Sequence, residues 1–289
     1  MKPALHHLVT GVVRRLRRLG NAPTWRAILR HPAPTIAAIG RALREAGSGQ
    51  LDAGERRRIQ AIEDRRQRLL LSSAKVTFLD YGAGSPGSDR TEAQMREGVA
   101  TTLPVSRICL SSKSPVWALL LFKMIRALKP RSCLELGTCL GISAAYQAAA
   151  LALNGVGRLV TIEGAHDIAA IAEETMKGQD LGGFVQIRIG PFHESLAPAL
   201  AAAQPIDFLF NDGHHNGKAL LQYFNQAFPF MAQESIVVFD DISWSEDMRA
   251  AWREIRSDGR VAVTIDLGVI GIAILSPGLS RQAFSLLWP

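Results

Sequence analysis

Residues 132–141 read Ser-Cys-Leu-Glu-Leu-Gly-Thr-Cys-Leu-Gly, and this stretch decides the fold of the chain. Its first half is a short apolar run, which predicts a buried strand over 132–136. The glycines that follow predict a tight turn, because glycine adopts backbone conformations that other residues avoid, and a helix then begins near Gly141. A helix that starts directly after such a turn presents free N–H groups, so the stretch predicts a binding place for a polar or anionic ligand.

Short apolar strands continue to alternate with helices towards the C-terminus. Four more strands are predicted, over 158–163, 185–189, 206–211 and 235–240. The helices between the strands begin near His166, Glu194 and Gly217. This alternation predicts a parallel sheet with helices on both faces.

The last predicted elements close the sheet. A helix over 246–256 is followed by strands over 261–266 and 270–275, which are close enough in sequence to pair as an antiparallel hairpin. The sequence therefore predicts an α/β fold with a seven-stranded sheet.

The composition is that of a globular protein. Of the 289 residues, 47% are hydrophobic and 20% are charged. No apolar run approaches the roughly 20 residues of a membrane span. Three scattered cysteines are too few for a disulfide framework. We therefore expect a cytoplasmic protein without a transmembrane segment.

Three regions are expected along the chain. Residues 1–75 are predicted to form a basic helical extension, in which Asp52 caps a helix over about 54–72. Residues 76–115, which include a stretch rich in Gly, Ser and Pro, are expected to form a loop or lid. Residues 116–289 are expected to form the α/β domain.

The net charge of +7 is concentrated in the N-terminal extension. Its arginines stand in short runs, at Arg14–Arg18, Arg56–Arg58 and Arg65–Arg66. Such runs can contact nucleic acid or an anionic membrane surface, or they can form a solvated helix face or a subunit contact. We favour the second interpretation, because charge runs alone are weak indicators of a binding function.

Acidic and histidine side chains gather after the fourth and fifth strands. Asp212, His214 and His215 follow the strand at 206–211, Asp240 ends the strand at 235–240, and Asp241 follows it. The carboxyl ends of parallel strands meet at one edge of the sheet, where ligands bind. Three carboxylates and two imidazoles in one place are costly without a role or a counter-charge, so this edge is a candidate functional site.

The spacing of Glu135, Gly137 and Gly141 resembles the first motif of the class I SAM-dependent methyltransferases, where SAM is S-adenosylmethionine. That resemblance implies a Rossmann-like seven-stranded methyltransferase sheet ending in an antiparallel hairpin. It also implies that Glu163, at the end of the second strand, accepts hydrogen bonds from the ribose hydroxyls of SAM. The cofactor-binding residues that the resemblance implies are Glu135, Gly137, Thr138, Gly141, Ser143, Glu163, Gly164, Gly190, Phe192 and Asp212.

The Asp-Gly-x-His and Asp-Asp-x-x-Trp runs look like those of the catechol and sugar O-methyltransferases that depend on a metal ion. The resemblance implies that Asp212, Asp240 and Asp241 hold Mg²⁺, since all-oxygen ligands suit that ion. It also implies a catalytic group of His215, His214 and Asp212, with His215 as the general base. The family carries an amide where this chain has Asp241, so whether a metal is bound stays open. In the metal-free alternative, Asp240 or Asp241 is a helix N-cap.

The expected function is O-methylation of a small hydroxylated acceptor, such as a natural product or a sugar, with SAM as the methyl donor. The alternative is a non-catalytic SAM-binding scaffold that acts through its basic N-terminal helices. A nucleic-acid substrate is disfavoured, because Asn211-Asp212-Gly213-His214 replaces the Pro-Pro-aromatic run of the amino-base methyltransferases. A dehydrogenase is disfavoured by the missing G-x-G-x-x-G fingerprint. The sequence leaves open whether the chain forms a homodimer.

Overall fold

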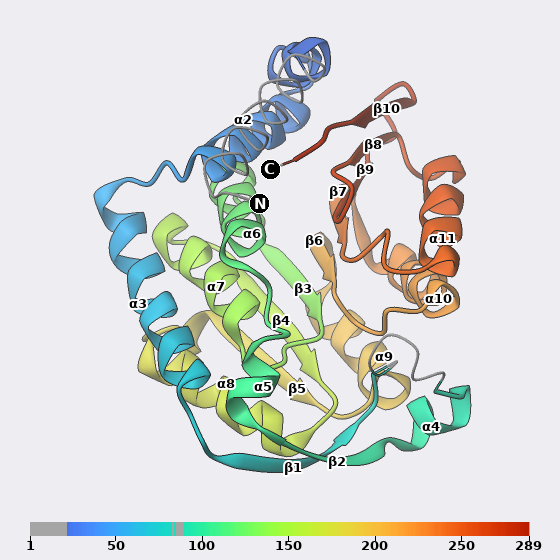
Figure 1. The fold of residues 1–289 in the computed structure, drawn as a ribbon. Coiled ribbons are helices and arrows are strands. Elements are labelled where there is room, and N and C mark those ends of the chain that lie inside the picture. The colour runs from blue at the N-terminus through green and yellow to red at the C-terminus, as the bar shows by residue number, and fades with distance from the viewer. Residues whose placement is uncertain (1–21, 83, 85–89, 289) are drawn as a thin grey trace, which may run out of the picture.

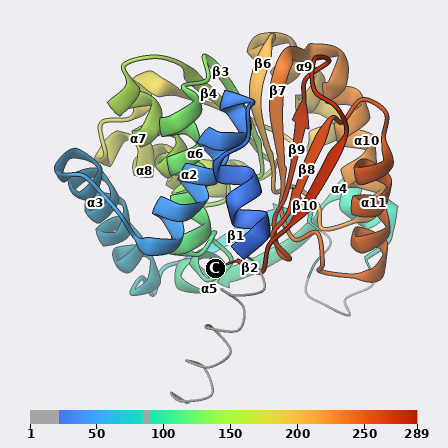
Figure 2. The same ribbon diagram turned by 90° about the horizontal axis from the view of Figure 1, so that it is seen from above.

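A computed structural model describes residues 22–82, 84 and 90–288 of the chain. At its centre is an eight-stranded sheet in the order β10-β8-β9-β7-β6-β3-β4-β5, with helices on both faces (Figures 1 and 2). The predicted α/β class and its mostly parallel sheet are therefore confirmed.

Five parallel strands form the middle of this sheet. They are β3 (Ser132–Leu136), β4 (Arg158–Glu163), β5 (Val185–Ile189), β6 (Ile206–Asn211) and β7 (Met231–Phe239). The first four have the bounds that their apolar runs predict. Strand β7 begins earlier than the predicted residue 235, because polar residues before its apolar run also take up the extended conformation.

The C-terminal strands confirm the predicted hairpin and add one strand to it. Strand β9 (Gly271–Leu275) lies antiparallel between β7 and β8 (Val263–Asp266). A further strand, β10 (Gln282–Ser285), pairs in parallel with β8 at the edge of the sheet. The predicted count of seven strands was one too low, because β10 is short and its side chains alternate between exposed and half-buried positions.

Helices cover the two faces of the sheet in separate layers (Figure 2). One face is covered by α6 (Pro115–Leu128), α7 (Ile142–Asn154) and α8 (His166–Gly178). The other is covered by α9 (Phe192–Ala203), α10 (Gly217–Ala227) and α11 (Glu246–Ser257). Buried apolar side chains form two clusters, with α6 and α7 in the first and α9, α10 and α11 in the second. Every helix among the described residues is too short or too polar to cross a membrane.

The N-terminal helices belong to the first of these layers. Residues 22–29 are helical, and α2 (Pro34–Ser48) packs on α6, while α3 (Ala53–Leu70) packs on α7. Asp52 caps α3 in a capping box with Glu55, which confirms the predicted cap. The first part of the predicted helical extension, residues 1–21 with Arg14, Arg15, Arg17 and Arg18, lies outside the described residues.

Arginines of α3 contact the neighbouring helix α8 and its C-terminal end. Arg58 donates to the carbonyl oxygen of Gln179 at 3.0 Å, and Arg65 donates to Oγ1 of Thr175 at 3.2 Å. Arg66 is buried and pairs with Glu63 on its own helix. These charges therefore hold α3 in place, a role that the sequence interpretation did not include.

The segment expected to be a loop over 76–115 contains regular structure. Strands β1 (Lys75–Asp80) and β2 (Val99–Pro104) pair as an antiparallel ribbon, and α4 (Glu92–Glu97) and α5 (Val105–Cys109) lie beside it. In Figure 1 the ribbon runs across the bottom of the molecule, below the ends of the sheet strands. The loop prediction was wrong over β1 and β2, because both strands lie outside the main sheet and lack the apolar run of a buried strand.

A buried ion cluster joins the N-terminal helices to α6. Nζ of Lys123 lies 2.6 Å from a carboxylate oxygen of Glu55 on α3 and 3.0 Å from one of Glu45 on α2. Arg126 also contacts Glu55, at 3.3 Å. Lys123 and Glu55 are both buried. Removing one partner would leave a charge without water or a counter-ion, which is costly.

We predict that Lys123→Ala lowers the free energy of unfolding by roughly 3–5 kcal/mol, because Glu45 and Glu55 lose their shared cation. The exposed Lys177 on α8 offers the control, and Lys177→Ala should stay within about 0.5 kcal/mol of the wild type. Urea unfolding of both variants measures the difference. Equal stabilities would show that the cluster does not hold the N-terminal helices.

Candidate active site

The turn after β3 leaves no room for a side chain at Gly137. This residue has a φ of 99°, and a Cβ atom added to it would lie 2.5 Å from the carbonyl oxygen of Asp212. The N–H groups of Gly137 and Thr138 both donate to the carbonyl oxygen of Ile162 at the end of β4. The turn is therefore held against both neighbouring strands, β4 and β6.

Gly141 and Glu163 fix the other side of the turn. Gly141, at the start of α7, has a φ of 81°, and an added Cβ would lie 2.9 Å from Cε of Met176 on α8. The carboxylate of Glu163 accepts hydrogen bonds from the N–H of Cys139 at 2.8 Å and the N–H of Ala165 at 3.0 Å. Burial raises the pKa of Glu163 to about 7. Its carboxylate thus joins the glycine-bearing turn to the end of β4.

Glu135 lies deeper than the other candidate residues. It is fully buried, and its carboxylate accepts hydrogen bonds from Gln147 at 2.7 Å and Thr161 at 2.6 Å. Burial raises its pKa to about 8. The hydroxyls of Thr138 and Thr161 are 2.6 Å apart, and Ser143 is also buried. These buried side chains support the turn that follows β3.

Residues of the β1–β2 segment lie over the ends of β4 and β5. An added Cβ at Gly164 would lie 2.7 Å from the ring of Tyr81, which directly follows β1. Gly190 has a φ of 136°, and its carbonyl oxygen accepts a hydrogen bond from Ser195. Phe192 then begins α9, and its ring lies so close to Gly213 that a Cβ atom added there would be 2.6 Å from it.

Two cavities meet at Glu163. The smaller, of about 180 Å³, is lined by Tyr81, Gly137, Gly164, Phe192 and Asp212 among others. The larger, of about 500 Å³, lies under the β1–β2 ribbon and α5. Its wall includes Phe78, Leu103, Arg107, Ile108, Cys139, His215 and Trp244. Phe78, Asp80, Glu163 and His215 line both cavities.

Two carboxylates of the candidate metal site face a lysine. Nζ of Lys113 forms an ion pair with Oδ2 of Asp240 and lies 3.5 Å from Oδ1 of Asp212. Asp240 is only 2% exposed, and burial raises the pKa of Asp212 while Lys113 opposes that shift. Lys113 lies between α5 and α6, far from both aspartates in sequence. A single lysine in a serine-rich turn carries no motif, so the sequence interpretation missed it.

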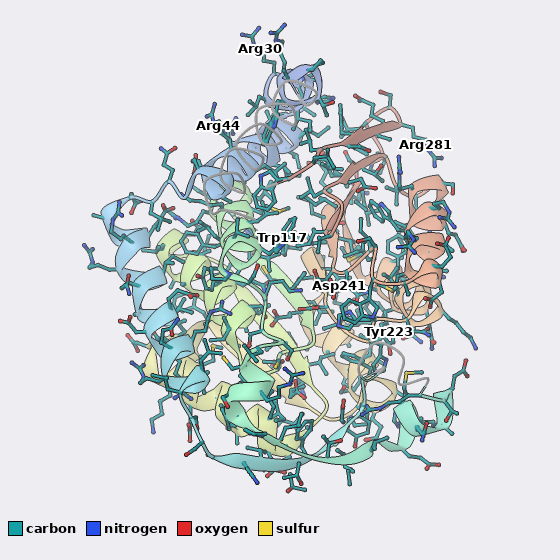
Figure 3. The ribbon with its side chains drawn as sticks, viewed as in Figure 1. Arg30, Arg44, Trp117, Tyr223, Asp241 and Arg281 are labelled. Carbon is teal, nitrogen blue, oxygen red and sulfur yellow. The ribbon has the colours of Figure 1, made fainter. Side chains whose placement is uncertain are left out.

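Asp241 points to a different partner. Its Oδ2 lies 3.3 Å from Nδ1 of His215, and the ring of His215 lies 5.5 Å from that of the exposed Trp244. Asp241 has a φ of 50°, in the left-handed region. In Figure 3 the half-buried Asp241 lies near the middle of the view, whereas Arg30 and Arg44 lie at its outer edge. The structure thus pairs His215 with a carboxylate.

His214 faces the α10 side of the same edge. Its Nδ1 lies 2.6 Å from the hydroxyl of Tyr223, and its ring makes an edge contact with Phe192. Burial lowers the pKa of His214, which favours the neutral ring. Its Nε2 is buried and has no hydrogen-bond partner among the described residues.

The carboxylates do not fit a metal ion as they are arranged. Asp212 and Asp240 converge on the ammonium of Lys113, which occupies the position of a cation, and Asp241 is paired with His215. No group of three or more His, Cys, Asp or Glu side chains within residues 22–82, 84 and 90–288 could hold a metal ion. The Mg²⁺ site that the resemblance implies therefore has no support in this geometry.

Residues 134–242 match a family described as a methyltransferase domain. A catechol O-methyltransferase from Niastella koreensis is 30% identical over 132 residues, which are 45% of this chain and 58% of that protein. This chain thus spans less than two thirds of that relative.

The fold resembles that of a solved structure. The match to an SAH-bound methyltransferase from Podospora anserina, where SAH is S-adenosylhomocysteine, has a TM-score of 0.51 and 16% identity. It covers 58% of this chain and 81% of that chain. An O-methyltransferase from Bacillus cereus in complex with SAH matches with a TM-score of 0.49 and 21% identity, over 59% of this chain and 86% of that chain.

The glycine-bearing turn, the strand order and the family match agree on the class of the chain. Residues 134–242 form a class I SAM-dependent methyltransferase domain.

We predict that Gly137→Ala lowers the free energy of unfolding by about 2–5 kcal/mol, the sum of left-handed strain and overpacking against Asp212. Gly155 is a matched control, because its φ is 67° but no atom lies within 4 Å of an added Cβ. Gly155→Ala should cost only the strain, about 1–2 kcal/mol. If chemical unfolding gives the same loss of stability for both variants, Gly137 does not lie close enough to Asp212 for an added Cβ atom to clash with it.

Proposed function

We propose that this chain transfers the methyl group of SAM to a hydroxyl group of a small acceptor. The main observation behind this proposal is that the turn at Gly137 lies against the backbone of Asp212. A cofactor bound at the turn would therefore lie beside the carboxylates that follow β6 and β7. A methyl donor and a group that can accept a proton would then be held in one place, which supplies much of the rate of a two-substrate reaction.

The residues around the smaller cavity suit SAM. Glu163 can accept hydrogen bonds from ribose hydroxyls, and Phe192 offers an aromatic ring beside Gly164 and Gly190 for the adenine. The cavity of about 180 Å³ is small for such a ligand, since ligand pockets usually measure about 300–1,000 Å³. The ring of Tyr81 occupies part of this space, so we propose that Tyr81 moves aside when SAM binds.

The acceptor is proposed to bind in the larger cavity under the β1–β2 ribbon. Its wall combines apolar side chains with the rings of Phe78 and Trp244 and the cation of Arg107. Aromatic walls favour a planar, apolar molecule, and His215 at one end of the cavity can meet its hydroxyl. A hydroxylated aromatic compound therefore fits this cavity better than a sugar does.

The chemistry follows from the paired histidine. SAM supplies an electrophilic methyl group. Asp241 orients His215 through Nδ1, which leaves Nε2 to take the proton of the acceptor hydroxyl. Buried polar atoms without partners among the described residues, Nδ2 of Asn211 and Nε2 of His214, also lie at this edge and are available to a ligand.

We predict that Glu163→Gln weakens SAM binding by about tenfold or more, because hydrogen bonds to a charged group contribute roughly 1.5–3 kcal/mol. The pKa of Glu163 is raised to about 7, so the carboxylate forms as pH rises through that value. Wild-type affinity should therefore increase with pH across this range, and the affinity of the variant should not. Calorimetric titration at several pH values measures both. Unchanged affinity in the variant would remove Glu163 from the ribose site.

We predict that Asp212→Ala lowers turnover by about 100-fold or more while SAM affinity changes only a few-fold, because the carboxylate lies beside the ammonium of Lys113 rather than in contact with Glu163. The exposed Asp64 on α3 lies away from this edge, and Asp64→Ala should leave turnover unchanged. Equal losses of binding and turnover in Asp212→Ala would contradict its chemical role.

The experiment that tests the proposed function is a screen of hydroxylated aromatic compounds, catechol among them, with SAM. Mass spectrometry detects the product by the added methyl group. We expect at least one methylated product, formed in equal yield with EDTA or with added Mg²⁺. A chain that binds SAM but methylates none of these compounds would contradict the proposed acceptor class, and a chain that does not bind SAM would contradict the function itself.

A further inference from the structure

A lysine of this chain supplies a positive charge at the edge of the sheet where Asp212 and Asp240 lie. Asp212 follows β6 and Asp240 follows β7, so the sheet brings their carboxylates together. Such a pair repels unless a cation lies between the two groups. Nζ of Lys113 lies there, in an ion pair with Asp240 and 3.5 Å from Asp212.

The burial of these groups makes the lysine necessary. Asp240 is 2% exposed, and apart from its ion pair with Lys113 its carboxylate oxygens have no hydrogen-bond partner among the described residues. The side chain of Lys113 is 11% exposed. A carboxylate without water or hydrogen bonds is strongly unfavourable unless a cation is paired with it. The Lys113 ammonium is thus the group that balances Asp240.

We propose that Lys113 is a built-in cation that replaces a divalent metal ion at this edge and holds the oxygen of the acceptor during methyl transfer. The inference rests on the proposed function. It also accounts for Asp241, which is free to orient His215 because it is not needed as a metal ligand.

Lys113 would act on the oxygen that carries charge during the reaction. The acceptor hydroxyl gives its proton to Nε2 of His215 as its oxygen bonds to the methyl carbon, and the electron pair of the broken S–C bond stays on sulfur. Negative charge grows on the acceptor oxygen before that bond is complete. An ammonium held by two carboxylates can donate a hydrogen bond to this oxygen without first being reorganised.

The experiment uses Mn²⁺ alone as a probe, with its binding to the full chain followed by electron paramagnetic resonance. Wild-type protein should bind no Mn²⁺ at this edge at millimolar concentration, so Asp240→Asn should not change its Mn²⁺ binding. Lys113→Ala should gain a Mn²⁺ site, because two facing carboxylates lose their cation. Adding Asp240→Asn to Lys113→Ala should remove that site. Lys177→Ala, an exposed control on α8, should behave like the wild type.

Two results would overturn the inference. One is a Mn²⁺ site in the wild type that Asp240→Asn removes, because the carboxylates would then hold a metal despite Lys113. The other is a folded Lys113→Ala variant that binds no Mn²⁺. If Lys113→Ala does not fold, the comparison of the wild type with Asp240→Asn still decides the matter. SAM titration of the same wild-type sample tests the proposed function separately, because a chain that binds no SAM would contradict that function whatever its Mn²⁺ binding.

Turnover provides a second readout with the acceptor that the screen yields. Lys113→Ala should lose about 100-fold in kcat, and Lys113→Arg, which keeps the charge, should lose less. SAM affinity should change little in both variants. Equal activity of Lys113→Ala and the wild type would show that the ammonium does not contact the reacting oxygen.

Discussion

The close approach of Gly137 to the carbonyl of Asp212 is the contact on which the site depends. Because no side chain fits between them, the turn after β3 and the edge after β6 form one surface. The backbone N–H groups at Gly137 and Thr138, bound to the end of β4, extend this surface to Glu163. The groups proposed to bind the cofactor and to take the proton therefore lie side by side on separate strands, which a reaction between two bound molecules requires.

Charge balance is the second constraint on this surface. Asp212, Asp240 and Asp241 are brought together by the ends of two adjacent strands. Asp212 and Asp240 share the ammonium of Lys113, and Asp241 pairs with His215. In the proposed mechanism this pairing separates two roles: an ammonium that stabilises charge, and an imidazole oriented to accept a proton. In that mechanism the site needs no metal ligand set, although the residue types in it resemble one.

The sequence predicted the parallel strands of the central sheet well, and it predicted the β1–β2 ribbon and the edge strand β10 poorly. Strands β3, β4 and β6 lie inside the sheet and are mostly buried, so each is a largely apolar run with clear ends. Strands β1, β2 and β10 are partly exposed, and their residue patterns do not stand out from those of loops. The sequence also indicated the acidic edge, since Asp212 and Asp240 follow strands. Lys113 could not be predicted, because its place beside them depends on how the segment before α6 crosses the sheet.

The central claim is that SAM lies between the turn at Gly137 and the carboxylate of Glu163. A crystal structure of the chain grown with SAH tests it most directly. The account predicts SAH density along this turn, with its ribose against Glu163 and the ring of Tyr81 displaced from Gly164. Density elsewhere, or Tyr81 still packed on Gly164 in a crystal saturated with SAH, would contradict it.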